Sequence, residues 1–156
     1  MALKASRRGG VPPFIVMDVL RAANALEAAG RSVMHLEVGQ PSTPAPRGVI
    51  AAARRALDED RLGYTEAFGL PVLRERIARH YREFYGVAVD ARRVVACTGS
   101  SGGFVLAFLA AFDAGDRVAL AVPGYPAYRN TLAALGIEPV LLEAGPEPHF
   151  QPTPET

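Results

Sequence analysis

The sequence is poor in several residue types that commonly carry chemistry. Its 156 residues include no tryptophan, one cysteine and three histidines. The single cysteine excludes an internal disulfide framework and a cysteine-rich zinc site. His35, His80 and His149 lie too far apart for a local metal motif, so we expect solvated or packing histidines and no metal. Lysine is equally scarce, because only Lys4 among the seventeen basic residues is a lysine.

Charge and hydropathy give no sign of a nucleic-acid or membrane partner. Seventeen basic residues stand against sixteen acidic ones, for a net charge of +1, which excludes a generally basic binding surface. The longest apolar stretch covers residues 104–112, whereas a membrane span needs about 20 residues. Residues 1–10 are basic, but prolines follow them where a secretory signal would have its apolar core, so no such signal is predicted. We therefore expect a cytoplasmic protein.

Helical periodicity dominates the first half of the chain. It predicts helices over 14–29, 47–58 and 70–85, with Gly30 as a left-handed cap of the first and Gly86 ending the third. The expected buried faces are Ile15, Val19, Ala22 and Leu26 in the first helix, and Leu73, Ile77, Tyr81 and Phe84 in the third. Between the first two helices we expect a strand over 32–38. The prolines of 39–46 then exclude regular structure and favour a boundary there.

The charged residues of the third helix predict a solvated surface. Arginines alternate there with Glu75 and Glu83, at positions Arg74, Arg76, Arg79 and Arg82. This alternation is not typical of a nucleic-acid track.

The second half of the chain alternates strands and helices. Strands are expected over 94–97, 117–122 and 138–142, with helices after 98–103 and from 126 to 136. This order is typical of an α/β fold with a parallel sheet covered by helices. Cys97, in the first of these strands, is expected to be an inert core thiol.

A glycine-rich turn is the first candidate site. Gly99, Ser100 and Ser101 come between an expected strand and a helix, where backbone amides and two hydroxyls suit a phosphate. The turn has neither the dinucleotide-binding fingerprint nor a Walker loop. Taken alone, it is better explained as a serine-capped helix start.

Three further pieces are candidate ligand contacts. Tyr125 stands between two prolines after an expected strand, where a rigid ring could support a flat ligand. The loop 64–69 begins with Tyr64, and Gly39 could let a ligand approach the backbone. Each of the three is individually compatible with an ordinary turn or connection.

Together and in this order, the pieces resemble the N-terminal part of a fold-type I, class I/II pyridoxal-phosphate-dependent aminotransferase of the aspartate aminotransferase-like type. They read LEVGQP at 36–41, YTEAFG at 64–69, TGSSGG at 98–103 and PGYPAY at 123–128. The resemblance implies that Gly99, Ser100 and Ser101 hold the phosphate of pyridoxal 5'-phosphate and that Tyr125 stacks on its ring. It also implies that Tyr64 reaches the phosphate of the neighbouring subunit in a homodimer, and that Gly39 lies near the substrate carboxylate.

The resemblance also implies an incomplete domain. Residues 1–45 would form the N-terminal arm and part of a small domain, and 46–156 the first part of the three-layer, parallel-sheet cofactor domain. The family's cofactor-binding lysine, an aspartate and a carboxylate-binding arginine would follow Thr156, and Lys4 is no plausible substitute. We therefore expect the 156 residues alone to be inactive, marginally stable and prone to aggregation through open strand edges.

The implied activity is transfer of an amino group between an amino acid and a 2-oxo acid. Two alternatives remain open. One is another pyridoxal-phosphate reaction on the same fold, such as a C–S lyase or a decarboxylase. The other is a non-catalytic module that binds a phosphate ligand or a partner, if the chain is complete.

Overall fold

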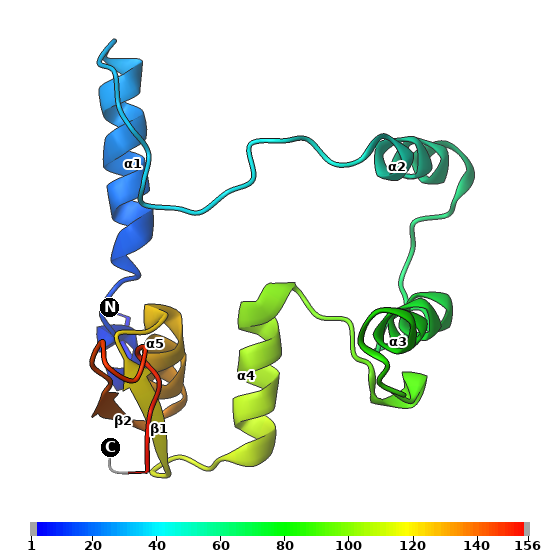
Figure 1. Ribbon diagram of the computed structural model, residues 1–156. Coiled ribbons are helices and arrows are strands. Elements are labelled where there is room, and N and C mark those ends of the chain that lie inside the picture. The colour runs from blue at the N-terminus through cyan, green and yellow to red at the C-terminus, as the bar shows by residue number, and fades with distance from the viewer. Residues whose placement is uncertain (1–2, 155–156) are drawn as a thin grey trace. The chain divides into compact units, whose positions relative to one another are not determined.

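The computed structural model (Figure 1) describes residues 3–154, which divide into two compact units. Residues 3–38 and 99–154 form the first unit, and residues 39–98 the second. The first contains η1 (Arg7–Gly10), α1 (Ile15–Ala28), α4 (Gly99–Ala111), β1 (Arg117–Val122), α5 (Pro126–Leu135) and β2 (Glu138–Glu143). The second contains α2 (Arg47–Glu59), α3 (Pro71–Tyr85) and η2 (Ala91–Arg93).

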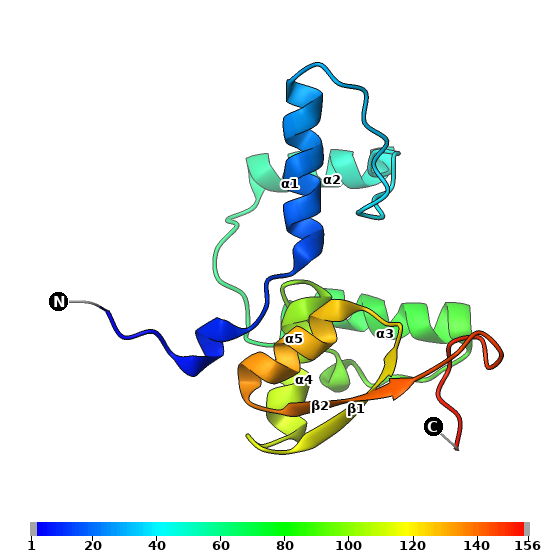
Figure 2. The same ribbon diagram turned by 90° about the vertical axis from the view of Figure 1, so that its left-hand side faces the viewer.

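A strand–helix–strand motif forms the centre of the first unit. β1 and β2 pair in parallel, in a register that runs from Arg117 opposite Glu138 to Val122 opposite Glu143. Figure 2 shows the two strands side by side, and α5 packs against β2. Leu132 of α5 is fully buried. These elements confirm the predicted strands over 117–122 and 138–142 and the helix between them.

The helix ends follow the local sequence signals. Proline occupies the first turn of α3 and of α5, where its missing N–H breaks no helical hydrogen bond. Gly30, Gly86 and Gly136 follow α1, α3 and α5 with φ angles of 80°, 69° and 81°. Those left-handed angles favour glycine, which confirms the predicted ends.

The predicted apolar helix faces are largely exposed. Ile15 and Leu26 of α1 are 67% and 42% exposed, and Phe84 of α3 is 72% exposed. Among residues 3–154, the buried hydrophobic side chains are Ala23, Ala78, Leu132, Ile137 and Ala144. The periodicity thus predicted the helices, but nothing in the described part of the chain covers most of their apolar faces.

Two predicted strands are absent from the described residues. Residues 32–36 and 94–97 have no regular secondary structure, residues 37–38 form a bend, and the sheet consists of β1 and β2. A strand needs a neighbour for its backbone hydrogen bonds, and the Ala96 N–H donates to the Phe68 carbonyl at 3.0 Å instead. Cys97 is exposed, so its predicted place in the core is also wrong.

The helices and the possible metal ligands of residues 3–154 bear on two kinds of site, a membrane span and a metal centre. None of the helices there combines the length and the apolar character that a membrane crossing requires. No group of three or more histidine, cysteine, aspartate or glutamate side chains within those residues is placed to hold a metal ion.

Candidate functional site

The start of α4 presents the predicted phosphate-binding residues. Gly99 is the first residue of the helix and has a φ of +72°, a left-handed angle that is unfavourable for residues with a Cβ. Ser100 and Ser101 are exposed in the first turn. The amides of a first turn have no partners within the helix, and the positive end of the helix dipole favours an anion there. Amides and hydroxyls thus occur together where a phosphate could bind.

The turn after β1 depends on a glycine for a close approach of the backbone. A Cβ on Gly124 would lie 2.6 Å from the carbonyl oxygen of Ala121. No real side chain tolerates such a contact, so only glycine fits this turn. Tyr125 follows as the N-cap residue of α5, with Pro126 fixing the first helical position.

The Tyr125 side chain is half-exposed and contacts other aromatic rings. Its ring centroid lies 5.3 Å from that of Tyr128 and 5.7 Å from that of Phe14, both with edge-type geometry. Tyr128 in turn lies 4.5 Å from Phe104 of α4. The Tyr125 residue nevertheless remains 51% exposed. Ring contacts therefore fix Tyr125 relative to α4 while leaving surface for a ligand.

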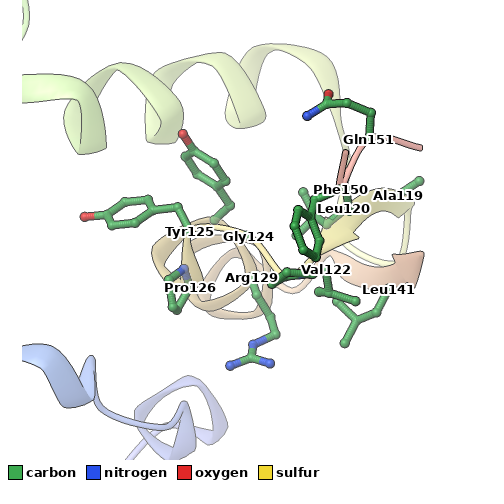
Figure 3. A pocket seen from close by; sticks show the side chains of 13 residues that line it. Ala119, Leu120, Val122, Gly124, Tyr125, Pro126, Arg129, Leu141, Phe150 and Gln151 are labelled. Carbon is green, nitrogen blue, oxygen red and sulfur yellow. The ribbon is translucent and has the colours of Figure 1, made fainter. Parts of the chain in front are cut away.

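A cavity of about 540 Å³ opens at the carboxyl end of β1. Its lining includes Val122, Tyr125, Arg129 and Phe150. Figure 3 shows Tyr125 extending from the start of α5 on the side away from Phe150 and Val122. The aromatic platform thus lies at the edge of the cavity, and the apolar residues of the strands form its floor.

The second unit contains the other two predicted site residues. Tyr64 is fully exposed in the loop between α2 and α3. Gly39, at the start of this unit, is also exposed, and no atom lies within 4 Å of the position a Cβ would take. The predicted roles of both residues remain predictions.

Arg74 of α3 is not the solvated residue that the charge pattern predicted. Its Nε donates a hydrogen bond of 2.9 Å to the carbonyl of Val94, and the contact is part-buried. Its guanidinium carbon lies 5.6 Å from the centroid of the Phe68 ring. The sequence pattern missed this because the hydrogen-bond partner is a backbone atom 20 residues away.

His35 lies between two carboxylates of the first unit. Its Nδ1 is 2.6 Å from Glu37 Oε1, and its Nε2 is 3.2 Å from Glu27 Oε2. The hydrogen bond with Glu37, and then that with Glu27, raises the pKa of His35 above its usual 6.5. The same contact lowers the pKa of Glu37. The protonated imidazole would connect the last turns of α1 to the segment that precedes Gly39.

Comparison with known proteins identifies the family. A family model described as "Aminotransferase class I and II" matches residues 31–155. The chain belongs to this aminotransferase family. Valine–pyruvate aminotransferase of Mycobacterium tuberculosis is 53% identical over 98% of the chain, and an aspartate aminotransferase of Geobacillus stearothermophilus is 30% identical over 97%. The chain spans 39% and 38% of the length of these two relatives.

Solved aminotransferases have the same fold over nearly the whole chain. A crystal structure of an aminotransferase from Mycobacterium tuberculosis matches with a TM-score of 0.93 and 53% identity, covering 97% of this chain and 39% of that one. Aspartate aminotransferase from Thermus thermophilus with maleate matches with a TM-score of 0.89 and 32% identity, covering 99% and 41%. The α/β fold with its small parallel sheet is therefore part of a fold-type I domain.

The described residues suit the cofactor of this aminotransferase family, pyridoxal 5'-phosphate. The amides and hydroxyls at the start of α4 can donate hydrogen bonds to a phosphate. Tyr125 offers a half-exposed ring just after the carboxyl end of β1, which is the edge at which parallel sheets bind ligands. Donors and aromatic surface of the required kinds thus occur in one unit.

Proposed function

We propose that this chain is the N-terminal part of a pyridoxal-phosphate-dependent aminotransferase that moves an amino group between an amino acid and a 2-oxo acid. The main support is the pair of ring contacts, Tyr125 with Tyr128 and Tyr128 with Phe104, that connects Tyr125 to α4. This helix begins with Gly99, Ser100 and Ser101. Residues 1–45 belong, in this proposal, to the N-terminal arm and small domain. Residues 46–156 begin the cofactor domain.

Each site residue has a distinct role in the proposal. The amides and hydroxyls of Ser100 and Ser101, after the turn at Gly99, bind the phosphate, and Tyr125 stacks on the pyridine ring. Tyr64 serves the phosphate site of the neighbouring subunit, which makes the complete protein a homodimer. Its full exposure is compatible with such a role. Gly39 lets the substrate carboxylate approach the backbone.

Residues outside this chain complete the site in our proposal. When bound, the cofactor supplies an electron sink for the substrate Cα. A lysine, an aspartate and a carboxylate-binding arginine must accompany it, and Lys4 is an exposed residue ahead of η1. Since the chain spans 39% of its valine–pyruvate aminotransferase relative, there is room for these groups in a longer protein. The 156 residues alone are then inactive.

Amino-group transfer in the complete gene product tests this proposal. The name of the 53%-identical relative makes valine and pyruvate the first substrate pair to assay, with formation of alanine as the readout. We expect transfer, and Tyr125→Ala should weaken cofactor binding about two- to tenfold because it removes the ring contact. Tyr125→Phe, which keeps the ring, is the matched control.

Other outcomes would replace the proposal. Release of ammonia or carbon dioxide without a new amino acid would indicate a lyase or a decarboxylase on the same fold. Binding of the cofactor without any covalent attachment or turnover would favour the non-catalytic phosphate-binding module.

A further inference from the structure

One arginine of the second unit lies where two site-bearing segments meet. Arg74 donates from Nε to the Val94 carbonyl, and its guanidinium lies over the Phe68 ring. No ion pair among residues 3–154 involves Arg74, whereas Arg76, on the same helix, pairs with Glu83 at 3.7 Å. The Arg74 side chain therefore acts on a backbone carbonyl and a ring rather than on a carboxylate.

The two segments that Arg74 contacts also contact each other. The Ala96 N–H donates to the Phe68 carbonyl at 3.0 Å. Gly69 is buried with a φ of +93°, and a Cβ there would lie 2.7 Å from the Ala96 Cβ. The end of the loop 61–69 thus packs against the segment 94–97 through this hydrogen bond and the close approach of Gly69 to Ala96. Arg74 contacts both segments.

Each of these segments leads to a residue of the proposed phosphate site. Tyr64 lies four positions before Phe68, in the same loop. Val94 lies five positions before Gly99, so its segment runs directly into the turn that begins α4. Within the second unit, the contacts of Arg74 therefore join the loop that includes Tyr64 to the segment that precedes the turn at Gly99.

We propose that Arg74 is a positioning residue for cofactor phosphate, which holds the loop of Tyr64 and the segment leading to Gly99 in one arrangement without touching the cofactor. This inference rests on the proposed function. The planar guanidinium suits the task because it can donate along its plane while its face covers an aromatic ring. Methionine at this position would keep the apolar stem but lose both interactions.

The test compares binding of pyridoxal 5'-phosphate with binding of pyridoxal, which lacks the phosphate, in the complete gene product. Arg74→Met should weaken binding of the phosphorylated compound about tenfold, from loss of one charge-assisted hydrogen bond. It should leave pyridoxal binding within about twofold. Arg74→Lys should recover part of the loss, because an ammonium can still donate to the carbonyl. Arg79→Met removes the same charge from an exposed site on the same helix and should change neither.

Amide exchange at Ala96 provides a second readout that does not depend on cofactor binding. Arg74→Met should accelerate exchange of this amide about tenfold, and Arg79→Met should not. If Arg74→Met fails to fold, Phe68→Leu and Arg74→Lys test the same contacts separately. Unchanged selectivity for the phosphate, or equal loss of both ligands, would overturn the role of Arg74. Failure of the unmodified protein to bind the cofactor would overturn the proposed function, and the Arg74 inference with it.

Discussion

The close approach of Gly69 to Ala96 gives a quantitative test of how the second unit is packed. Gly69 and Gly86 both have positive φ, of 93° and 69°. A Cβ on Gly86 would meet no atom within 4 Å, whereas one on Gly69 would lie 2.7 Å from the Ala96 Cβ. Substitution with alanine at the two positions therefore separates backbone strain from steric collision.

The expected free-energy changes differ by the cost of the collision. Gly86→Ala should destabilise the unit by about 1–2 kcal/mol, because a left-handed backbone opposes any Cβ. Gly69→Ala carries a similar strain and a further cost of about 1–3 kcal/mol, since the Ala96 Cβ is attached to the backbone and cannot rotate away. The additional cost corresponds to a factor of about 5–150 in an opening equilibrium.

Amide exchange at Ala96 measures this difference, because that amide is bonded to the Phe68 carbonyl next to Gly69. The exchange rate of the Ala96 amide in Gly69→Ala should exceed that in Gly86→Ala by a factor of about 5–150. Equal acceleration in the two variants would refute the close approach, since both share the positive φ.

Three further predictions concern the first unit. Leu132→Ala should cost about 2–5 kcal/mol, because Leu132 is fully buried, and Leu109→Ala far less, because Leu109 is 60% exposed; urea unfolding of the two variants compares them. Gly99→Ala should lower the free energy of unfolding by about 1–2 kcal/mol from its φ of +72° alone, and it should also weaken phosphate binding. Calorimetry with pyridoxal phosphate measures the affinity, and an unchanged affinity would argue against phosphate binding at the turn that begins α4. Proton NMR should give His35 a pKa above 6.5, and Glu37→Gln should lower it. The stabilisation from this contact should be complete below pH 6.5 and disappear as pH rises through the folded-state pKa; a normal His35 pKa would contradict the contact.

Local signals in the sequence predicted local structure well. The ends of α1, α3 and α5 follow from single glycines whose left-handed φ no other residue adopts cheaply. The parallel pairing of β1 and β2 follows from the strand–helix–strand order, since a helix between two strands returns the chain in the same direction.

Features that depend on distant partners were predicted poorly. The segments 32–38 and 94–97 have strand-like composition, but a strand forms only beside another strand. The exposed faces of α1 and α3 show the same dependence, because periodicity identifies an apolar face without identifying what covers it. Arg74 was overlooked because neighbouring arginines and glutamates mimic a solvated helix face.

From the residues alone the candidate site was predictable as separate pieces, and the family resemblance joined these pieces into one cofactor site. The sequence indicated the glycine turn at Gly99 and the aromatic at Tyr125, each with an ordinary structural explanation. Their connection through Tyr128 and Phe104 needed the folded chain, since no sequence pattern pairs residues on α4 and α5. Phe14, which packs against Tyr125 from a segment more than a hundred residues earlier, was likewise not indicated.

Borohydride reduction of the complete gene product, followed by peptide mass mapping, shows which lysine binds the cofactor covalently. We infer that this chain supplies the phosphate and ring contacts of a pyridoxal-phosphate site whose covalent lysine lies elsewhere. We predict one reduced cofactor per subunit, attached to a lysine outside residues 1–156, and no attachment in the 156-residue chain alone. Attachment to Lys4, or a complete protein without any bound cofactor, would contradict the account.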